Sequence, residues 1–326
     1  MLDWEAITTI TAINDNYGNN DNYDNYDNND INDKNDKNDK NGINANNDTP
    51  KNMPKKYDTV LSIAGSDSGG GAGIQADIKT ISSLGCYAAT AITAVTVQNT
   101  VGVTAVHPIP SDIVAAQIKA VIDDIGAKAV KIGMLQSSET VAAIANCLRQ
   151  YGIRNIVIDP VMVSTSGHRL TDEKAVEALK DLLIPQARVI TPNIPEAEIL
   201  LQGKPLTKQA DLHEAARQLS LRYGTSVLLK AGHLTEERLV DYFYDAEEET
   251  MIELPSVRIH TRNTHGTGCT MSSAFAALLA KGLPLQDAAR GAKEYINNAI
   301  IAGADYEIGH GHGPVCHFNS LSLNEK

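Results

Sequence analysis

One glycine-rich segment has the residue types of an anion-binding site. Residues 263–270 read Asn-Thr-His-Gly-Thr-Gly-Cys-Thr and lead into residues 271–279, an apolar stretch typical of a helix. Glycines at a helix start allow several backbone N–H groups to converge where a phosphoryl group in transfer carries its charge. Cys269 lies in the first turn, where the helix dipole lowers the pKa of a thiol. Gly266, Gly268 and Cys269 are therefore candidate catalytic residues, with a buried structural cysteine as the alternative.

A second glycine-rich segment covers residues 65–73 and reads Gly-Ser-Asp-Ser-Gly-Gly-Gly-Ala-Gly. Glycines let the backbone approach a ligand closely, and the free N–H groups of a following helix favour an anion or a polar ligand edge. The segment has neither the Gly-Lys-Ser/Thr of a Walker A loop nor the Gly-x-Gly-x-x-Gly spacing of a dinucleotide site. By itself it is equally compatible with a flexible connection.

Polar residues stand where several predicted strands end. Asp159, Asn193 and Lys230 each follow a short apolar run, and Glu196 comes three residues after Asn193. Carboxylate and amide oxygens can hold a hydrated Mg²⁺ on nucleotide phosphates, and a lysine can contact phosphate oxygens. For Asn193 and Glu196 alone, a helix N-terminus is the simpler explanation. The convergence of all four residues on one sheet edge favours a functional site.

The elements that must position these residues alternate along the chain. Apolar runs bounded by Gly, Pro or polar residues predict buried strands, and longer stretches with helical spacing predict helices. Strands are expected at residues 59–64, 129–132, 156–158, 188–190 and 227–229, with an antiparallel pair at 239–244 and 250–254. Helices are expected at residues 74–84, 114–125, 141–148, 172–183 and 212–219, and from about 268 and about 284.

This alternation predicts an α/β fold. The expected architecture is a doubly wound, mostly parallel sheet with helices on both faces, and residues 87–97 and 103–106 add strands outside the main order. In such sheets a ligand binds beyond the carboxyl ends of the strands. The candidate residues described above all fall at those ends.

The N-terminal segment differs in composition from the rest. Residues 1–56 carry eleven acidic groups and six lysines, and residues 14–48 consist almost entirely of Asn, Asp, Tyr, Lys and Gly. Because so few apolar residues cannot offset the entropy of ordering, we expect a disordered low-complexity tail at 1–56 followed by one domain at 57–326. An Asn-rich interaction segment is the alternative.

Charge and composition also exclude several classes of protein. The chain has a net charge of −12, which disfavours a nucleic-acid partner because phosphate neutralisation needs clustered Lys and Arg. No run of about eighteen apolar residues indicates a membrane span. The four cysteines form no C-x-x-C pair, so a reducing compartment is expected, and the sequence predicts a cytoplasmic protein.

Taken together, the motifs resemble the hydroxymethylpyrimidine/phosphomethylpyrimidine kinases of thiamine biosynthesis, in the ribokinase-like superfamily. The matching segments are collinear over roughly residues 57–318, and such a series is far more specific than any one of its parts. They are residues 63–67, 70–77, 97–100, 131–134, 159–162, 191–197, 230–233, 265–270 and 309–315.

The resemblance implies a reaction and a role for each candidate residue. It implies ATP- and Mg²⁺-dependent phosphorylation of 4-amino-5-hydroxymethyl-2-methylpyrimidine to its monophosphate and then to its diphosphate, by a homodimer. It assigns the pyrimidine amino group and ring nitrogen to Gln98. The other expected roles are a pyrimidine pocket of Gly65, Ala72, Asp77, Met134 and Val161, an anion hole of Gly266, Gly268 and Cys269, and a nucleotide and Mg²⁺ site of Asp159, Asn193, Glu196 and Lys230, with Asp159, Asn193 and Glu196 holding the metal through water or phosphate.

Two other functions remain open from the sequence. A pyridoxal kinase is the first, because some members of this family accept that ring, and Gln98 favours the pyrimidine only modestly. The second is a non-catalytic pyrimidine-binding domain, which could lose Gly266, Gly268 and Cys269 without penalty. Sugar kinases of the wider superfamily carry an aspartate base where this chain has Cys269, and Ala231 replaces a glycine often found beside the nucleotide.

Overall fold

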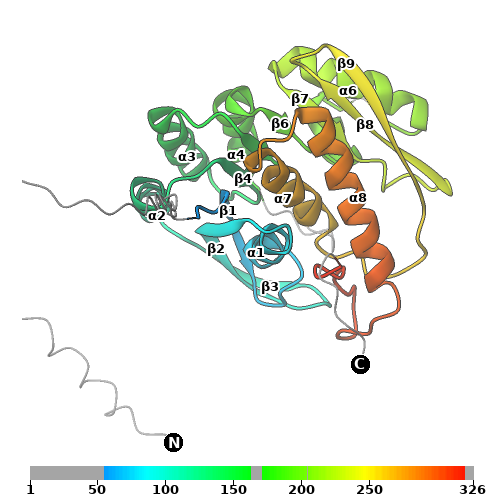
Figure 1. Cartoon of the computed structure of the whole chain (residues 1–326), viewed down its shortest axis with the longest axis horizontal. Helices are drawn as coiled ribbons and strands as arrows, with labels where there is room; N and C mark the ends of the chain where they lie inside the picture. Colours follow the sequence, from blue (N-terminus) through cyan, green and yellow to red (C-terminus); the bar gives the residue numbers. More distant parts are fainter. Residues whose placement is uncertain (1–54, 163–170, 204, 320–326) are drawn as a thin grey trace, which may run out of the picture. The chain divides into compact units, whose positions relative to one another are not determined.

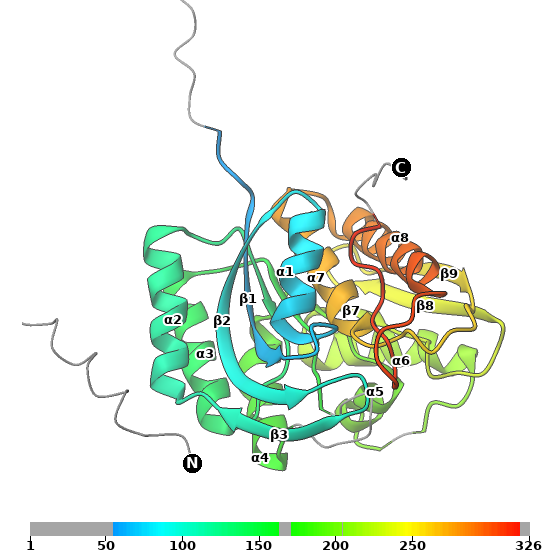
Figure 2. The same ribbon diagram turned by 90° about the horizontal axis from the view of Figure 1, so that it is seen from below.

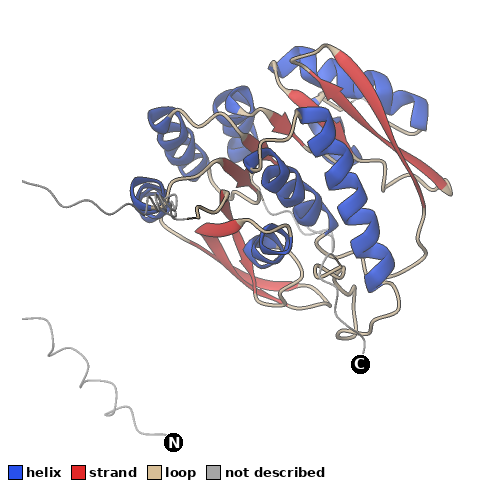
Figure 3. Ribbon diagram, viewed as in Figure 1, coloured by secondary structure: helices blue, strands red, loops and turns tan. Residues whose placement is uncertain are grey.

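The computed structural model describes residues 55–162, 171–203 and 205–319. Most of the predicted tail lies outside these residues, so the tail and the domain limits stay predictions. Within the described part, nine strands form one sheet in the order β3-β2-β1-β4-β5-β6-β7-β8-β9 (Figures 1 and 3). The strands are β1 (Thr59–Asp67), β2 (Tyr87–Gln98), β3 (Val103–Pro108), β4 (Ala129–Ile132), β5 (Ile156–Ile158), β6 (Val189–Ile190), β7 (Ser226–Leu229), β8 (Arg238–Asp245) and β9 (Thr250–Val257).

Helices cover both faces of this sheet, as predicted. They are α1 (Gly73–Ser83), α2 (Ser111–Asp124), α3 (Ser138–Tyr151), α4 (Glu173–Ala178, extended by a π turn and a 3₁₀ turn to Gln186), α5 (Ile194–Leu200), α6 (Gln209–Tyr223), α7 (Thr267–Ala280) and α8 (Leu285–Gly303). None of the helices in the described ranges is long and apolar enough to cross a membrane.

The sheet is parallel in its middle and antiparallel at its edges. Strands β2, β1, β4, β5, β6 and β7 pair in parallel, while β3 pairs antiparallel with β2, and β8 and β9 form the predicted antiparallel pair. Parallel neighbours need crossover connections, and the helices provide them. The carboxyl ends of the parallel strands therefore meet at one edge, where the candidate residues lie.

Two apolar cores hold the helices against the sheet. Leu61 belongs to the core under α2, α3, α4 and α6, whereas Val60 belongs to the core under α1, α7 and α8. In Figure 2, α7 lies between α1 and α8, and it packs against both. Because the central strands are covered on both faces, every residue of β4 and β5 is buried, and all of them are apolar except Lys131.

Strand β1 is longer than predicted. The expected strand stops before Gly65, but β1 continues to Asp67 because Ser66 and Asp67 pair with Val95 and Thr96 of β2 after a register shift near Gly65. The first three residues of the glycine-rich segment are therefore strand. This extension carries Asp67 to the edge where the ligand site is expected.

Candidate active site

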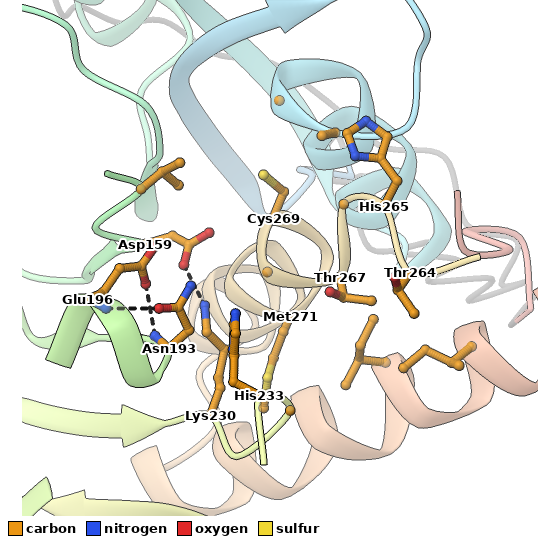
Figure 4. A pocket seen from close by; sticks show the side chains of 18 of the residues that line it. Asp159, Asn193, Glu196, Lys230, His233, Thr264, His265, Thr267, Cys269 and Met271 are labelled. Atoms are coloured by element: carbon orange, nitrogen blue, oxygen red, sulfur yellow. Dashed lines mark hydrogen bonds and ion pairs between the residues drawn. The ribbon is translucent and has the colours of Figure 1, made fainter. Parts of the chain in front are cut away.

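A single cavity of about 710 Å³ lies at the carboxyl edge of the sheet (Figure 4). Its lining comes from the ends of β1, β2, β4, β5, β6 and β7 and from the N-terminus of α7. The lining includes twelve of the thirteen predicted site residues: Gly65, Ala72, Gln98, Met134, Asp159, Val161, Asn193, Glu196, Lys230, Gly266, Gly268 and Cys269. The structure thus brings together segments more than 200 residues apart in the sequence.

Asp77 is the exception, and its expected place in the pyrimidine pocket is wrong. It does not line the cavity; its side chain is fully buried between α1 and the sheet. Its carboxylate accepts hydrogen bonds from Lys131 Nζ at 2.8 and 2.9 Å, from Ser62 Oγ at 2.6 Å and from Ser273 Oγ at 2.7 Å. Because a buried carboxylate needs a counter-charge and donors, Asp77 serves the packing of α1, β1, β4 and α7.

The start of α7 has the geometry expected of an anion hole. Gly266 is the N-cap residue with φ +80°, and a Cβ there would collide with the carbonyl oxygen of Gly71. A Cβ at Gly268 would lie 3.2 Å from Asp159 Oδ2 and 3.3 Å from Lys230 Nζ. The first turn of α7 therefore lies close to the Asp159–Lys230 pair, and the N–H groups of a helix start can bind an anion.

Cys269 lies in this first turn, but its thiol is not activated as the sequence suggested. The side chain is only partly exposed, and burial raises its pKa to about 11 even though the nearby Lys131 charge opposes the shift. Desolvation therefore outweighs the helix dipole, and Cys269 is a neutral thiol at neutral pH in the absence of ligand.

A lysine and two carboxylates form the charged side of the cavity (Figure 4). Lys230 Nζ lies 2.7 Å from Asp159 Oδ1, and Thr191 donates to the same oxygen at 3.2 Å. Burial alone would lower the pKa of Lys230, but Asp159 and Glu196 outweigh it and raise the pKa above its ordinary value. Burial raises the pKa of Glu196 to about 7, although Lys230 opposes this. Because one lysine faces two carboxylates, this group has no net positive charge, and an anion of several charges would need a cation held by the carboxylates as well.

Asn193 and Glu196 also have the simpler structural role considered above. Asn193 caps α5, accepting the Glu196 N–H at 2.9 Å, and Glu196 Oε2 accepts the Asn193 N–H at 2.8 Å. This capping box fixes both side chains beside the cavity. In the described ranges, no three or more His, Cys, Asp or Glu residues are grouped so that they could hold a metal ion.

Asp67 and His265 also line the cavity, and the sequence assigns neither of them a role, although both lie in the matching motifs. Asp67 accepts the backbone N–H groups of Gly69, Gly71 and Ala72 at 2.8, 3.1 and 2.9 Å, and so shapes the glycine-rich turn. His265 Nε2 lies 2.9 Å from Asp67 Oδ2. The sequence signal for Asp67 is its position two residues before a glycine, because an aspartate there often accepts hydrogen bonds from the backbone N–H groups of the following turn.

Comparisons with known proteins agree with this geometry. The family model described as phosphomethylpyrimidine kinase matches residues 67–316. The chain belongs to that family. It is 52% identical over 259 residues to the hydroxymethylpyrimidine/phosphomethylpyrimidine kinase of Rhizobium meliloti, and the match covers 79% of this chain and 96% of the relative.

Solved structures of family members share the fold. The crystal structure of phosphomethylpyrimidine kinase from Clostridium difficile is 41% identical, with a TM-score of 0.65, and covers 74% of this chain and 99% of its own. The ADP complex of Bacillus subtilis pyridoxal kinase is 38% identical, with a TM-score of 0.75, and the match covers 82% of this chain and 100% of the kinase chain. The predicted family and fold are thereby confirmed, and both substrate classes occur among the relatives.

Proposed function

We propose that this phosphomethylpyrimidine kinase family member transfers the γ-phosphoryl group of ATP to the hydroxymethyl group of 4-amino-5-hydroxymethyl-2-methylpyrimidine. It then phosphorylates the monophosphate to the diphosphate. The observation that carries the proposal is that one cavity holds the N-terminus of α7, the Lys230–Asp159 group and the Gln98 side chain. In this proposal the N-terminus of α7 is an anion hole between a phosphate-binding side and a ring-binding side.

In this proposal the residues of the chain act mainly by position and charge. Gln98 holds the ring so that its hydroxymethyl group faces Cys269 and the N–H groups of α7. Those N–H groups, together with Lys230, stabilise the charge on the phosphoryl oxygens during transfer. Because the transition state is loose, the hydroxyl proton needs an acceptor only late, and the thiolate form of Cys269, not the neutral thiol of the ligand-free site, would be that acceptor.

We also propose a Mg²⁺ ion bound with the nucleotide. Asp159 and Glu196 both line the cavity with buried carboxylates, and Mg²⁺ usually binds through one or two carboxylates, waters and substrate phosphates. Because Asn193 Oδ1 caps α5, its contact with the ion would run through water. The ion would neutralise phosphate charge. The absence of a larger ligand group in the described residues fits such a hydrated, nucleotide-borne ion.

Pyridoxal phosphorylation is the second candidate, and the similarity to the Bacillus subtilis pyridoxal kinase favours it. The test is turnover with ATP and either ring, measured side by side as ADP formation. We expect a higher kcat/KM for the hydroxymethylpyrimidine. A preference for pyridoxal would replace the proposed substrate, and the absence of ADP formation with both rings would support the non-catalytic alternative.

We propose that the chain acts as a homodimer in the cytoplasm. Val95, Val97 and Val101 are 46, 58 and 70% exposed on β2 and the turn after it, and a second copy covering them would remove this apolar surface from water. The four cysteines are all unpaired, as is usual in a reducing compartment. Light scattering of the parent protein should give a molar mass twice that of the chain, and Val97→Glu should lower this mass to that of one chain. A parent protein with the mass of one chain would exclude the dimer.

A further inference from the structure

Asp67, Gln98 and His265 meet at the ring-binding side of the cavity. They come from β1, from β2 and from the segment before α7, and Figure 4 shows His265 projecting from that segment. His265 Nε2 lies 2.9 Å from Asp67 Oδ2 and 3.2 Å from the side-chain amide of Gln98. The side chains of His265 and Asp67 are only 13 and 3% exposed. The mechanism above gives these two residues no task.

The protonation of His265 follows from its neighbour. Burial would raise the pKa of Asp67, but the hydrogen bonds from His265, Ala72 and Gly69 outweigh it and lower the pKa below its ordinary value. An ionised carboxylate only accepts hydrogen bonds. The His265 nitrogen that faces Asp67, which is Nε2, therefore carries a proton.

That proton decides which way the Gln98 amide points. With its nitrogen toward His265 Nε2–H, two donors would face each other, so a 180° rotation that presents the carbonyl oxygen is favoured. The other end of the amide lies 3.1 Å from Thr96 Oγ1, whose own proton goes to the Ser66 carbonyl at 2.8 Å. After the rotation the amide nitrogen donates to Thr96 and the oxygen accepts from His265. No two donors then face each other: the one Nε2–H of His265 is shared between Asp67 and Gln98, and one Gln98 N–H stays unused.

We propose that the Asp67–His265 pair is a positioning device that fixes the orientation of the Gln98 amide and thereby selects the substrate ring. A glutamine amide has two N–H groups and two acceptor sites on its oxygen. Thr96 and His265 use one of each, so one N–H and one acceptor remain for the ligand. The remaining N–H and the remaining acceptor of Gln98 together fit a ring edge on which an acceptor nitrogen stands beside an amino group.

The backbone holds the imidazole of His265 in place. A Cβ at Gly71 would lie 2.5 Å from His265 Cδ2, so the ring packs where only glycine leaves room. The His265 N–H donates to the carbonyl of Gly313 at 3.0 Å, which ties it to the C-terminal segment. The device is therefore rigid, as selection between similar rings requires.

The inference rests on the proposed pyrimidine kinase activity, and a matched pair of variants tests it. In H265Q the new amide nitrogen stands near the position of Nε2 and can donate to both Asp67 and Gln98, whereas H265L cannot donate. We expect H265L to lower the ratio of kcat/KM for hydroxymethylpyrimidine to that for pyridoxal by about tenfold or more, the size of one lost ring contact. H265Q should keep most of the ratio, and the KM for ATP should change little in either variant.

A double-mutant cycle separates positioning from a general structural effect. If His265 acts through Gln98, H265L has no further effect on the ratio in a Q98A background. H213L, a substitution of an exposed histidine on α6, is the matched control and should leave the ratio unchanged. If H265L does not fold, H265N replaces it, because its amide is too short to reach both partners.

The outcomes keep the inference and the proposed function apart. If the parent enzyme prefers the pyrimidine and H265L has the same ratio of kcat/KM values for the two rings, the inference is overturned but the proposed function is not. Equal losses in H265L and H265Q, or additive effects in the cycle, overturn it as well. A parent enzyme that phosphorylates no pyrimidine overturns the proposed function and the inference with it.

Discussion

The buried Lys131–Asp77 pair allows a prediction with a distinctive dependence on pH. Lys131→Met leaves Asp77 buried with its two serine donors but without a counter-charge. Breaking such a pair on one side costs about 3–5 kcal/mol, against a total unfolding free energy of about 5–15 kcal/mol for a domain. Asp77→Asn leaves Lys131 unpaired and should cost a similar amount. Lys131→Met combined with Asp77→Asn removes both charges and should cost clearly less than either single change.

The two single variants should respond to pH in opposite directions. In the parent protein, burial alone would lower the pKa of Lys131, but Asp77 outweighs it and raises the pKa, so on the alkaline side the pair's contribution is lost only above the ordinary lysine value of 10.5. In Lys131→Met the folded state favours a protonated Asp77, so stability falls as pH rises, by at most about 1.4 kcal/mol per pH unit. In Asp77→Asn the folded state favours a neutral Lys131, so stability increases with pH. The double variant should show neither slope.

Urea unfolding followed by circular dichroism at about pH 6, 7 and 8 measures these free energies. The parent protein measured under the same conditions supplies the background slope. A loss of less than about 1 kcal/mol in Lys131→Met would refute the reasoning, because such a value is typical of an exposed pair. Parallel slopes in the two single variants would also refute it.

Three further predictions each rest on one residue. Cys269→Ser should lower kcat about tenfold or more in steady-state assays with little change in the KM for ATP, because the proposed mechanism places the thiol at the reacting hydroxyl and not at the nucleotide; unchanged turnover would remove Cys269 from the mechanism. Gly266→Ala should lower the free energy of unfolding in urea by more than about 2 kcal/mol, because the residue has a positive φ and its Cβ would collide with the Gly71 carbonyl oxygen. Gly102→Ala, which has open space around its Cβ, should leave that free energy nearly unchanged. Burial lowers the pKa of His317 to about 4 from 6.5, so the folded state binds fewer protons and stability falls as pH decreases through that window. His317→Gln should flatten this decline in acid unfolding curves.

The scaffold and most of the site could be predicted from the sequence because strand ends are marked locally. Asp159, Asn193 and Lys230 each follow a short apolar run that is buried on both faces, and parallel strands bring such ends to one edge. Helix α5 was expected only as a helix N-terminus at Asn193 and Glu196, without bounds, because it has only seven residues and Pro195 in its first turn. Its capping box was the available signal.

The contacts that could not be predicted join residues far apart in the chain. Lys131 within a buried strand signals a hidden partner, but many acids could pair with it, and Asp77 is 54 residues away. Asp67 and His265 are 198 residues apart. The raised pKa of Cys269 depends on how completely the surrounding segments exclude water, which local sequence does not encode.

The most direct test of the proposed function is to follow the products over time. The protein is incubated with ATP, Mg²⁺ and hydroxymethylpyrimidine, and anion-exchange chromatography separates the pyrimidine, its monophosphate and its diphosphate. We expect the monophosphate to appear first and then to decline as the diphosphate accumulates, with neither product formed by a Lys230→Met variant. Consumption of ATP without any phosphorylated pyrimidine would contradict the account.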